Sequence, residues 1–156
     1  MQLEGQAALV LGALGTAGAA ISTKLAEDGA SVMFGARRQD EGREFARSLV
    51  ARGLRASFQA VDVTSREQVR QAVDTTVSEF GRIDILVNCF SVDHLRRFLD
   101  DEEEWWDRML AVNLKGTFYA CHAALPPMVA QQYGRVITLT SDSGKIGATM
   151  ETVQSA

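Results

Sequence analysis

The residues best suited to bind a ligand are three glycines, Gly12, Gly15 and Gly18, which follow the apolar run 7–11. Glycines at a turn between a strand and a helix let the backbone approach a pyrophosphate closely. The helix that follows directs its free N–H groups and the positive end of its dipole at that anion. A tight turn without a ligand is the alternative, but the strand–turn–helix context favours a dinucleotide. The predicted cofactor contacts of this turn are Gly12, Leu14, Gly15, Thr16, Ala17 and Gly18.

Two arginines indicate which dinucleotide the turn would bind. An acidic residue about 20 positions after the glycines would accept a hydrogen bond from the ribose 2′-hydroxyl and select NAD. The second apolar run, 31–34, leads instead into Gly35-Ala36-Arg37-Arg38, without a carboxylate. Guanidinium groups form charge-assisted contacts with a 2′-phosphate, although a pair of solvated surface arginines is the alternative. The sequence therefore favours NADP(H) over NAD(H), with Arg37 and Arg38 as binding residues.

The other residues with chemical potential do not form a site by their spacing. The two histidines and two cysteines lack the spacing of metal ligands, so no metal site is predicted. Cys89 is interpreted as a packed apolar residue, with a reactive thiol as the alternative. The acidic run 100–104 is interpreted as a solvated helix start, because negative charge complements the helix dipole there.

Composition limits the classes of protein to which the chain can belong. It has 156 residues, with 16 Lys and Arg against 20 Asp and Glu, a formal net charge of −4 and 46% hydrophobic residues. These values are typical of a globular domain with a sizeable core. A mildly acidic chain has no electrostatic reason to bind nucleic acid, and no apolar run approaches the roughly 18 residues of a membrane span. Two cysteines and a start without a secretory signal predict a reduced, cytoplasmic protein.

Short apolar runs alternate with longer amphipathic stretches, and this order predicts the elements that position the glycines and arginines. Helices are expected between the strands, one of them beginning with the capping box Thr64-Ser65-Arg66-Glu67. A long helix over 102–124 is expected to kink or end at Pro126-Pro127. Continuous apolar strands that alternate with helices predict an α/β fold, a doubly wound Rossmann-type parallel sheet with helices on both faces. The expected strands are 7–11, 31–34, 57–63, 83–87 and 135–140.

Five motifs, in this order and spacing, give the chain a specific likeness to a known family. They are the glycine turn 12–18, Asp62-Val63, Leu86-Val87-Asn88, Ala111-Val112-Asn113-Leu114-Lys115-Gly116 and the run 134–141. On these motifs the chain, from Gln6 onward, resembles the N-terminal part of a classical short-chain dehydrogenase/reductase. The resemblance implies about five of that family's seven strands in a single, incomplete domain over 1–156, with the C-terminal part of the fold absent.

The resemblance also implies roles for single residues. Asp62 would bind the adenine amino group with Val63 beside it, and Asn88 would support the cofactor and the neighbouring strand. Asn113 would hold a water of the proton relay through its helix backbone. Ser141 would hydrogen-bond the substrate carbonyl or hydroxyl. Because this family pairs its subunits through the long helix, the resemblance further implies a homo-oligomer.

Three departures from the family pattern affect the expected cofactor site. Leu11 stands where Thr is usual, which removes a hydroxyl that would tie down the turn. Thr16 stands where the middle glycine is usual, and a β-branched residue is costly there if φ must be positive. Cys89-Phe90-Ser91 replaces Asn-Ala-Gly, and the bulk of Phe90 is expected to narrow the nicotinamide side of the cleft.

A fourth departure affects catalysis. In the family the general acid/base is a Tyr about 13 residues after the serine, followed four residues later by a Lys. Counting from Ser141 reaches Gln154, and the Lys position lies past the last residue of this sequence. A carboxamide has no titratable proton, so it cannot replace the phenol.

The sequence as a whole predicts an NADP(H)-dependent oxidoreductase of short-chain dehydrogenase/reductase type. Its reaction would be hydride transfer between the nicotinamide and a carbonyl or secondary alcohol of a small-molecule substrate. The alternative is a dinucleotide-binding protein or fragment without turnover, which Gln154 and the absent Lys favour if these 156 residues are the whole protein. If the natural protein continues, a longer loop could instead place a Tyr just beyond Ala156.

Overall fold

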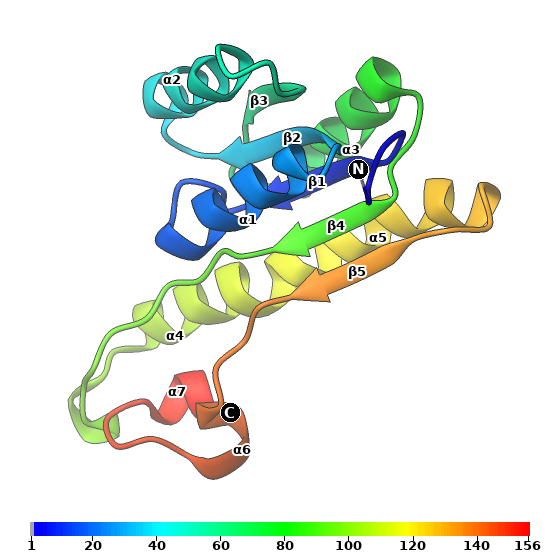
Figure 1. The fold of residues 1–156 in the computed structure, drawn as a ribbon. Coiled ribbons are helices and arrows are strands. Elements are labelled where there is room, and N and C mark those ends of the chain that lie inside the picture. The colour runs from blue at the N-terminus through cyan, green and yellow to red at the C-terminus, as the bar shows by residue number, and fades with distance from the viewer. Residues whose placement is uncertain (1) are drawn as a thin grey trace.

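The central element of the fold is strand β1 (Ala7–Leu11), which pairs with a parallel strand on each side. In the computed structural model, which describes residues 2–156, five parallel strands form one sheet in the order β3-β2-β1-β4-β5 (Figure 1). The strand order changes direction between β1 and β4, so the doubly wound α/β sheet predicted from the sequence is confirmed. The other strands are β2 (Ser31–Ala36), β3 (Ala56–Ala60), β4 (Ile85–Asn88) and β5 (Arg135–Thr138).

One face of the sheet is covered by α1 (Thr16–Glu27) and α2 (Gln39–Val50). Ala26 of α1 and Leu49 of α2 belong to the apolar cluster on this face, and Phe34 of β2 is buried beneath them. Apolar side chains recur every three to four residues along these helices because that spacing keeps them on one side.

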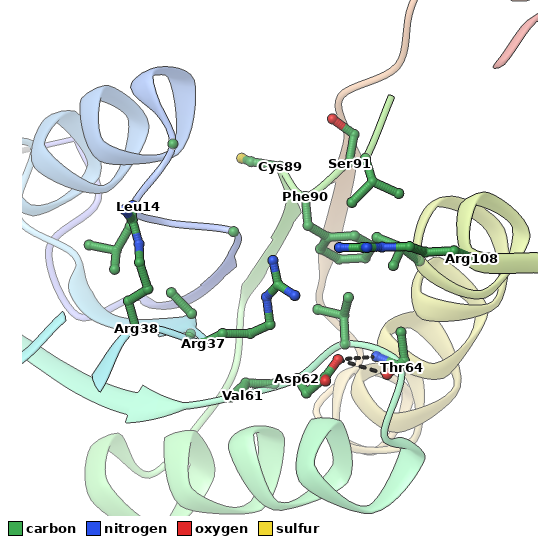
Figure 2. A pocket seen from close by; sticks show the side chains of 17 residues that line it. Leu14, Arg37, Arg38, Val61, Asp62, Thr64, Cys89, Phe90, Ser91 and Arg108 are labelled. Atoms are coloured by element: carbon green, nitrogen blue, oxygen red, sulfur yellow. Dashed lines mark hydrogen bonds between the residues drawn. The ribbon is translucent and has the colours of Figure 1, made fainter. Parts of the chain in front are cut away.

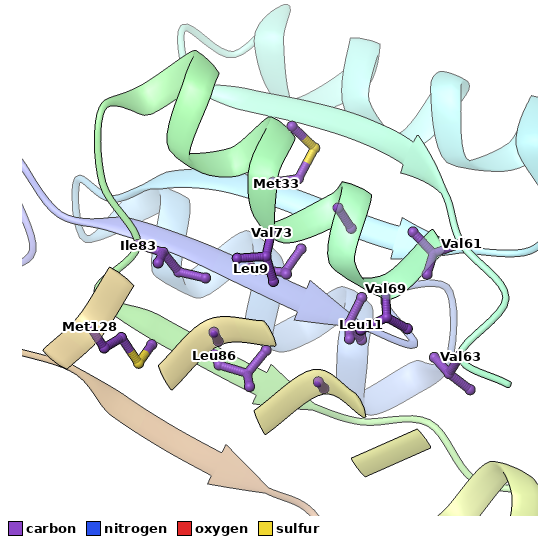
Figure 3. Packing of buried hydrophobic residues seen from close by; sticks show 13 residues of the cluster. Leu9, Leu11, Met33, Val61, Val63, Val69, Val73, Ile83, Leu86 and Met128 are labelled. Carbon is purple, nitrogen blue, oxygen red and sulfur yellow. The ribbon is translucent and has the colours of Figure 1, made fainter. Parts of the chain in front are cut away.

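The other face is covered by α3 (Arg66–Phe80) and α5 (Gly116–Ala130). Figure 3 shows Val73 of α3 and Met128 of α5 packed toward the side chains of β1 and β4. Because both faces are covered, the strands are apolar at consecutive positions instead of alternating with polar residues.

The long helix of the sequence forms as three joined segments. These are α4 (Glu103–Met109), the π-helical segment η2 (Leu110–Lys115) and α5. No sequence pattern indicates the π turn. The helix continues through Pro126-Pro127 to Ala130, so the end expected at the prolines is not observed. Pro126 and Pro127 have no backbone N–H, so the helix lacks two hydrogen bonds there. Burial of Ala124 and Met128 in the core, on either side of the prolines, offsets this loss.

Several element ends differ from the sequence-based expectation by two or three residues. The third strand ends at Ala60 rather than at residue 63, because its partner β2 ends at Ala36. The last hydrogen bond between the two segments runs from Val61 N to the carbonyl of Ala36. The fourth strand begins at Ile85 rather than at 83, and the fifth ends at Thr138 rather than at 140. The N-cap of α3 is Ser65 and not Thr64, since the Ser65 hydroxyl accepts from Gln68 N at 3.3 Å.

A buried carboxylate, Asp84, joins three segments at the edge of the sheet where the strands begin. Asp84 is fully buried, and its Oδ2 accepts from the backbone N–H of Ala7 at 2.8 Å. Arg82 donates to both carboxylate oxygens, each at 2.7 Å. Gln131, just past α5, donates to the neighbouring carbonyl of Ile83 at 2.6 Å. This cluster fixes β1, β4 and the end of α5 relative to one another.

After β4 and after β5 the chain leaves the sheet on the side of the strand C-terminal ends. The first excursion contains η1 (Phe98–Asp100), and the second contains α6 (Ser143–Ile146) and α7 (Thr152–Ser155). The two meet where Arg96 N donates to Met150 O at 2.9 Å. Within residues 2–156, no helix is long and apolar enough to cross a bilayer.

Candidate functional site

The glycine turn at the end of β1 is held in shape by backbone contacts. The N–H groups of Gly12 and Ala13 donate to Gly35 O at 2.9 and 3.3 Å, which ties the turn to β2. Gly12 has a φ of +83°, and a Cβ there would lie 2.7 Å from Phe90 N. A Cβ at Gly18 would lie 2.8 Å from Ala13 Cα and closer still to Gly12 O. The close approach of backbone to backbone therefore requires glycine at both positions.

The departures at Leu11 and Thr16 are accommodated without strain. Leu11 is buried beneath Gly35, so its side chain adds to the core, and the bonds to Gly35 O secure the turn in place of a hydroxyl. Thr16 is the first residue of α1 and does not have a positive φ, so the cost considered for a β-branched residue does not arise. Gly15 is the N-cap. No side chain caps this helix, which leaves the N–H groups of its first turn available to an anion.

A cleft of about 630 Å³ lies between the glycine turn and the ends of β2, β3 and β4 (Figure 2). Of the predicted cofactor residues it brings together Gly12, Leu14, Gly15, Arg37, Arg38, Asp62 and Val63. The remaining ones, Thr16, Ala17, Gly18 and Asn88, support the turn or the sheet but do not line this cleft. The cleft is also lined by residues that were not predicted to bind the cofactor, among them Gly35, Thr64, Arg108 and Val112.

The two arginines at the end of β2 have different surroundings. Arg38 forms an exposed ion pair with Glu41 at 3.1 Å and extends beside Leu14, as Figure 2 shows. Arg37 makes no hydrogen bond or ion pair with any residue of 2–156 and points into the cleft. Its charge contributes to the low pKa of Asp62. An unpaired guanidinium inside a cleft is available to an anionic ligand.

Asp62 is held in a turn just past β3. Its Oδ1 accepts from the backbone N–H and the hydroxyl of Thr64 at 2.9 and 2.8 Å. The Thr64 backbone bond is the largest cause that lowers the pKa of Asp62, with the Thr64 hydroxyl and Arg37 adding to it against the effect of burial. The carboxylate is therefore ionised at neutral pH and able to accept a hydrogen bond from a ligand amino group.

The residues after β4 line the inner wall of the cleft. A Cβ at Gly116 would lie 3.0 Å from the Phe90 ring and 3.3 Å from Val63, so the ring lies on the side of the cleft that holds Asp62. Burial raises the pKa of the Cys89 thiol, which favours its neutral form and agrees with a packed cysteine. Asn88 is buried and donates from Nδ2 to Thr138 Oγ1 at 3.2 Å, which links β4 to β5.

Asn113 lies in the π turn, and its side chain bridges two excursions of the chain. Its Oδ1 accepts from Val92 N, and its Nδ2 donates to Val92 O and to Gln154 Oε1, all at 2.9 Å. Its backbone carbonyl accepts from the Thr117 hydroxyl at 2.9 Å. π turns occur frequently at functional sites. The structure thus joins Asn113 to Gln154, the residue at the position expected for a tyrosine.

Ser141 lies just beyond β5 and is not among the residues that line the cleft. Its Oγ accepts from Ser143 N at 3.2 Å, which forms a local turn at the start of α6. Ser141, Asn113 and Gln154 all come from segments that leave the sheet beyond the strand C-terminal ends, the side where open α/β sheets bind ligands. In the described part of the chain, no group of three or more His, Cys, Asp or Glu side chains could hold a metal ion.

Comparison with known proteins gives a consistent result. A family model described as short chain dehydrogenase matches residues 6–156. The chain is 34% identical over 151 residues to 3-oxoacyl-[acyl-carrier-protein] reductase FabG of Thermotoga maritima, which covers 94% of this chain and 60% of that protein. It is 36% identical over 143 residues to glycine betaine reductase ATRR of Emericella nidulans, covering 92% of this chain and 11% of that one.

Among solved structures, the crystal structure of gox2181 matches with a TM-score of 0.95 and 29% identity. The match covers 99% of this chain and 61% of that one. The chain therefore spans about three fifths of the length of gox2181 and of the reductase FabG.

Proposed function

Because the chain belongs to the short-chain dehydrogenase/reductase family, we propose that its cleft binds NADP(H) in preference to NAD(H). The proposed reaction is hydride transfer between the nicotinamide and a carbonyl or secondary alcohol of a small molecule. The observation that carries this proposal is the pairing of a glycine turn with Arg37 and Arg38 on one cleft, with no carboxylate at the end of β2.

The residues present fit a dinucleotide. A Cβ at Gly12 or Gly18 would clash with backbone atoms of the protein, so glycine at both positions keeps the turn in the compact form that would lie against a pyrophosphate. The uncapped N-terminus of α1 would hold the pyrophosphate, and Arg37 with Arg38 would hold a 2′-phosphate. Asp62 would accept from the adenine amino group. When bound, the cofactor supplies or accepts the hydride, and the protein orients it.

The proton of the proposed reaction needs a group that can release one. Ser141 can donate a hydrogen bond to a substrate oxygen and so polarise a carbonyl. Gln154 can donate a hydrogen bond but cannot transfer a proton, because a carboxamide does not titrate near neutral pH. Loss of a general acid costs about 10²–10⁴ in rate.

A second candidate function is dinucleotide binding without turnover. The bond of Asn113 Nδ2 to Gln154 Oε1 favours it, because Gln154 stands where the family pattern has its acid and also engages the amide of Asn113. In that case the chain would act as a sensor of NADP(H) or as the partner of a complete homologue.

Two measurements test these proposals. Titration calorimetry of the 156-residue chain should give tighter binding of NADPH than of NADH. Replacing both Arg37 and Arg38 with Ala should weaken NADPH by about 10- to 100-fold, since a hydrogen bond to a charged group contributes about 1.5–3 kcal/mol, and leave NADH nearly unchanged. Arg47→Ala, an exposed change on α2, is the control. Equal affinity for both cofactors in the unaltered chain would contradict the NADP(H) assignment.

Turnover separates the two candidate functions. NADPH oxidation is followed at a saturating concentration against a panel of ketones and other carbonyl compounds. Measurable turnover supports the oxidoreductase, whereas tight NADPH binding without turnover supports the second candidate.

We also propose that the chain forms a homo-oligomer and lies in the cytoplasm. Leu110, Leu114 and Phe118 are exposed at a spacing of four along η2 and α5, and further along α5 Leu125 and Val129 are exposed as well. Such a row of large apolar side chains is typical of a protein–protein contact. The cytoplasmic location rests on the two unpaired cysteines.

A further inference from the structure

Arg108 of α4 lies on the wall of the cleft opposite Arg37. Its side chain extends from the helix toward Phe90 and Arg37, as Figure 2 shows, and it lines the cleft together with Val112 one turn further along. No carboxylate among residues 2–156 forms an ion pair with it. The cleft therefore holds a third guanidinium, and it comes from a different element than the two at the end of β2.

Aromatic contacts hold this guanidinium near the cleft. Its Cζ lies 5.4 Å from the ring centre of Trp105, a cation–π distance. The Trp105 ring stacks on His94 with 4.1 Å between ring centres and 8° between planes. His94 Nε2 in turn lies 2.8 Å from Asp101 Oδ1. Trp105 thus has a fixed orientation, and the planar head of Arg108 is positioned by it.

The surface next to Arg108 is apolar. Phe90, Val112 and Val63 line the cleft with it. The Phe90 ring and the Val63 side chain would lie 3.0 and 3.3 Å from a Cβ at Gly116, so both adjoin the start of α5. The carboxylate of Asp62 lies on the far side of these residues. A flat apolar ring with an amino group at one edge fits this space, because its faces meet apolar walls and its edge meets a carboxylate. A phosphate fits less well, since it would meet the guanidinium of Arg108 but also apolar side chains and the carboxylate of Asp62.

We propose that Arg108 stacks its guanidinium on the adenine ring of the bound dinucleotide and so adds affinity through the base. The inference rests on the proposed function, because it needs a dinucleotide in the cleft. Guanidinium groups are planar and weakly hydrated, and they stack on aromatic faces more readily than ammonium groups. Since every adenine dinucleotide carries the same base, this contribution is equal for NADP(H) and NAD(H).

The test uses two ligands that share the base and differ in one phosphate, ADP-ribose and 2′-phospho-ADP-ribose. Titration calorimetry gives their dissociation constants for the unaltered chain, Arg108→Ala, Arg108→Lys and the control Arg47→Ala. Arg108→Ala should weaken both ligands by the same factor, about five- to tenfold. Arg108→Lys should recover only part of the loss, because it keeps the charge and loses the planar group. Circular dichroism confirms that each variant is folded.

Three results would overturn the inference. Unchanged affinity of Arg108→Ala for both ligands would show that Arg108 makes no contact. Weakening of 2′-phospho-ADP-ribose alone would assign Arg108 to the phosphate instead of the base. If the unaltered chain binds neither ligand, the proposed function itself fails and the inference fails with it. In the first two results the unaltered chain still binds, so they leave the proposed function standing.

Discussion

Substituting Gly18 with alanine is expected to weaken dinucleotide binding while the chain remains folded. The added Cβ would lie 2.8 Å from Ala13 Cα and closer still to Gly12 O, both of which are backbone atoms. Cβ atoms essentially never approach other atoms within 3.0 Å, so α1 and the turn must move apart by several tenths of an ångström. Gly12 and Ala13 also hold the turn against β2, so the movement is transmitted to that contact.

The stability change of Gly18→Ala is the difference of two opposed effects. Overpacking costs about 1–3 kcal/mol. Alanine is favoured over glycine within a helix by up to about 1 kcal/mol, and Gly18 lies within α1. The expected net loss is therefore about 0–3 kcal/mol. Binding has no such compensation, because the N–H groups of the turn must all face the same anion, and a loss of at least tenfold is expected.

Urea unfolding measures the free energy of unfolding, and titration calorimetry with NADPH measures binding. The control is Gly144→Ala, because Gly144 also lies in a helix but a Cβ there would have no neighbour within 4 Å. The control should raise the free energy of unfolding by up to about 1 kcal/mol, since it gains the helix preference of alanine without a clash, and it should leave NADPH binding unaltered. NADPH affinity of Gly18→Ala within threefold of the unaltered chain would refute the reasoning that the glycine turn contacts the cofactor.

Three further changes test the sheet, the cleft and the apolar row. Asp84→Asn should lower the free energy of unfolding by about 1.5–3 kcal/mol, because the new amide group would face N–H donors where the buried carboxylate now accepts from Ala7 and from the half-exposed Arg82. The exposed Asp100→Asn should cost less than about 1 kcal/mol, and equal losses of the two variants in urea unfolding would contradict this. Asp62→Asn should be less stable than the unaltered chain at pH 7, and the difference should vanish in acid. Folding lowers the pKa of Asp62 from its usual 3.8, so the carboxylate stabilises the folded chain above that pH. This stabilisation is lost as the pH falls through the pKa of the folded chain. A stability difference between the two proteins that stays constant down to pH 2 would argue against this. Phe118→Glu should shift the mass measured by light scattering to that of a monomer, while Val50→Glu, at similar exposure on α2, should leave the mass unchanged. An unchanged mass for both variants would count against the exposed apolar row of η2 and α5 as the contact between subunits.

The parts of the fold that follow from apolar periodicity were predictable from the sequence. The order of strands and helices and the double winding of the sheet needed only the alternation of apolar runs with amphipathic stretches. The ends of the elements were less predictable, because they depend on partners that are distant in the sequence. The third strand, for example, ends where β2 stops offering hydrogen bonds at Ala36.

The candidate site was predictable where a local motif marks it. Gly12 and the pair Arg37 and Arg38 could be identified because a turn glycine, or a charged residue just after a strand, is recognised from the few residues next to it. Arg108 could not, since it belongs to no motif and reaches the cleft only because α4 projects past the sheet. The one available signal was its place four residues before Val112, on the same side of the helix.

The π turn has a consequence for the phase of the long helix. Residues 112, 116, 120, 124 and 128 follow at intervals of four, and the sheet-facing members from Gly116 to Met128 are buried. In a regular α-helix each step of four residues overshoots a full turn by about 40°, so a row this long would rotate away from the sheet. The wider turn at 110–115 takes up part of that rotation. Deletion of a single residue there would remove the extra residue of the π turn and leave a regular α-helix from α4 into α5. The π turn thus places one additional residue between Arg108 on the cleft wall and the buried row of α5 without interrupting the helix.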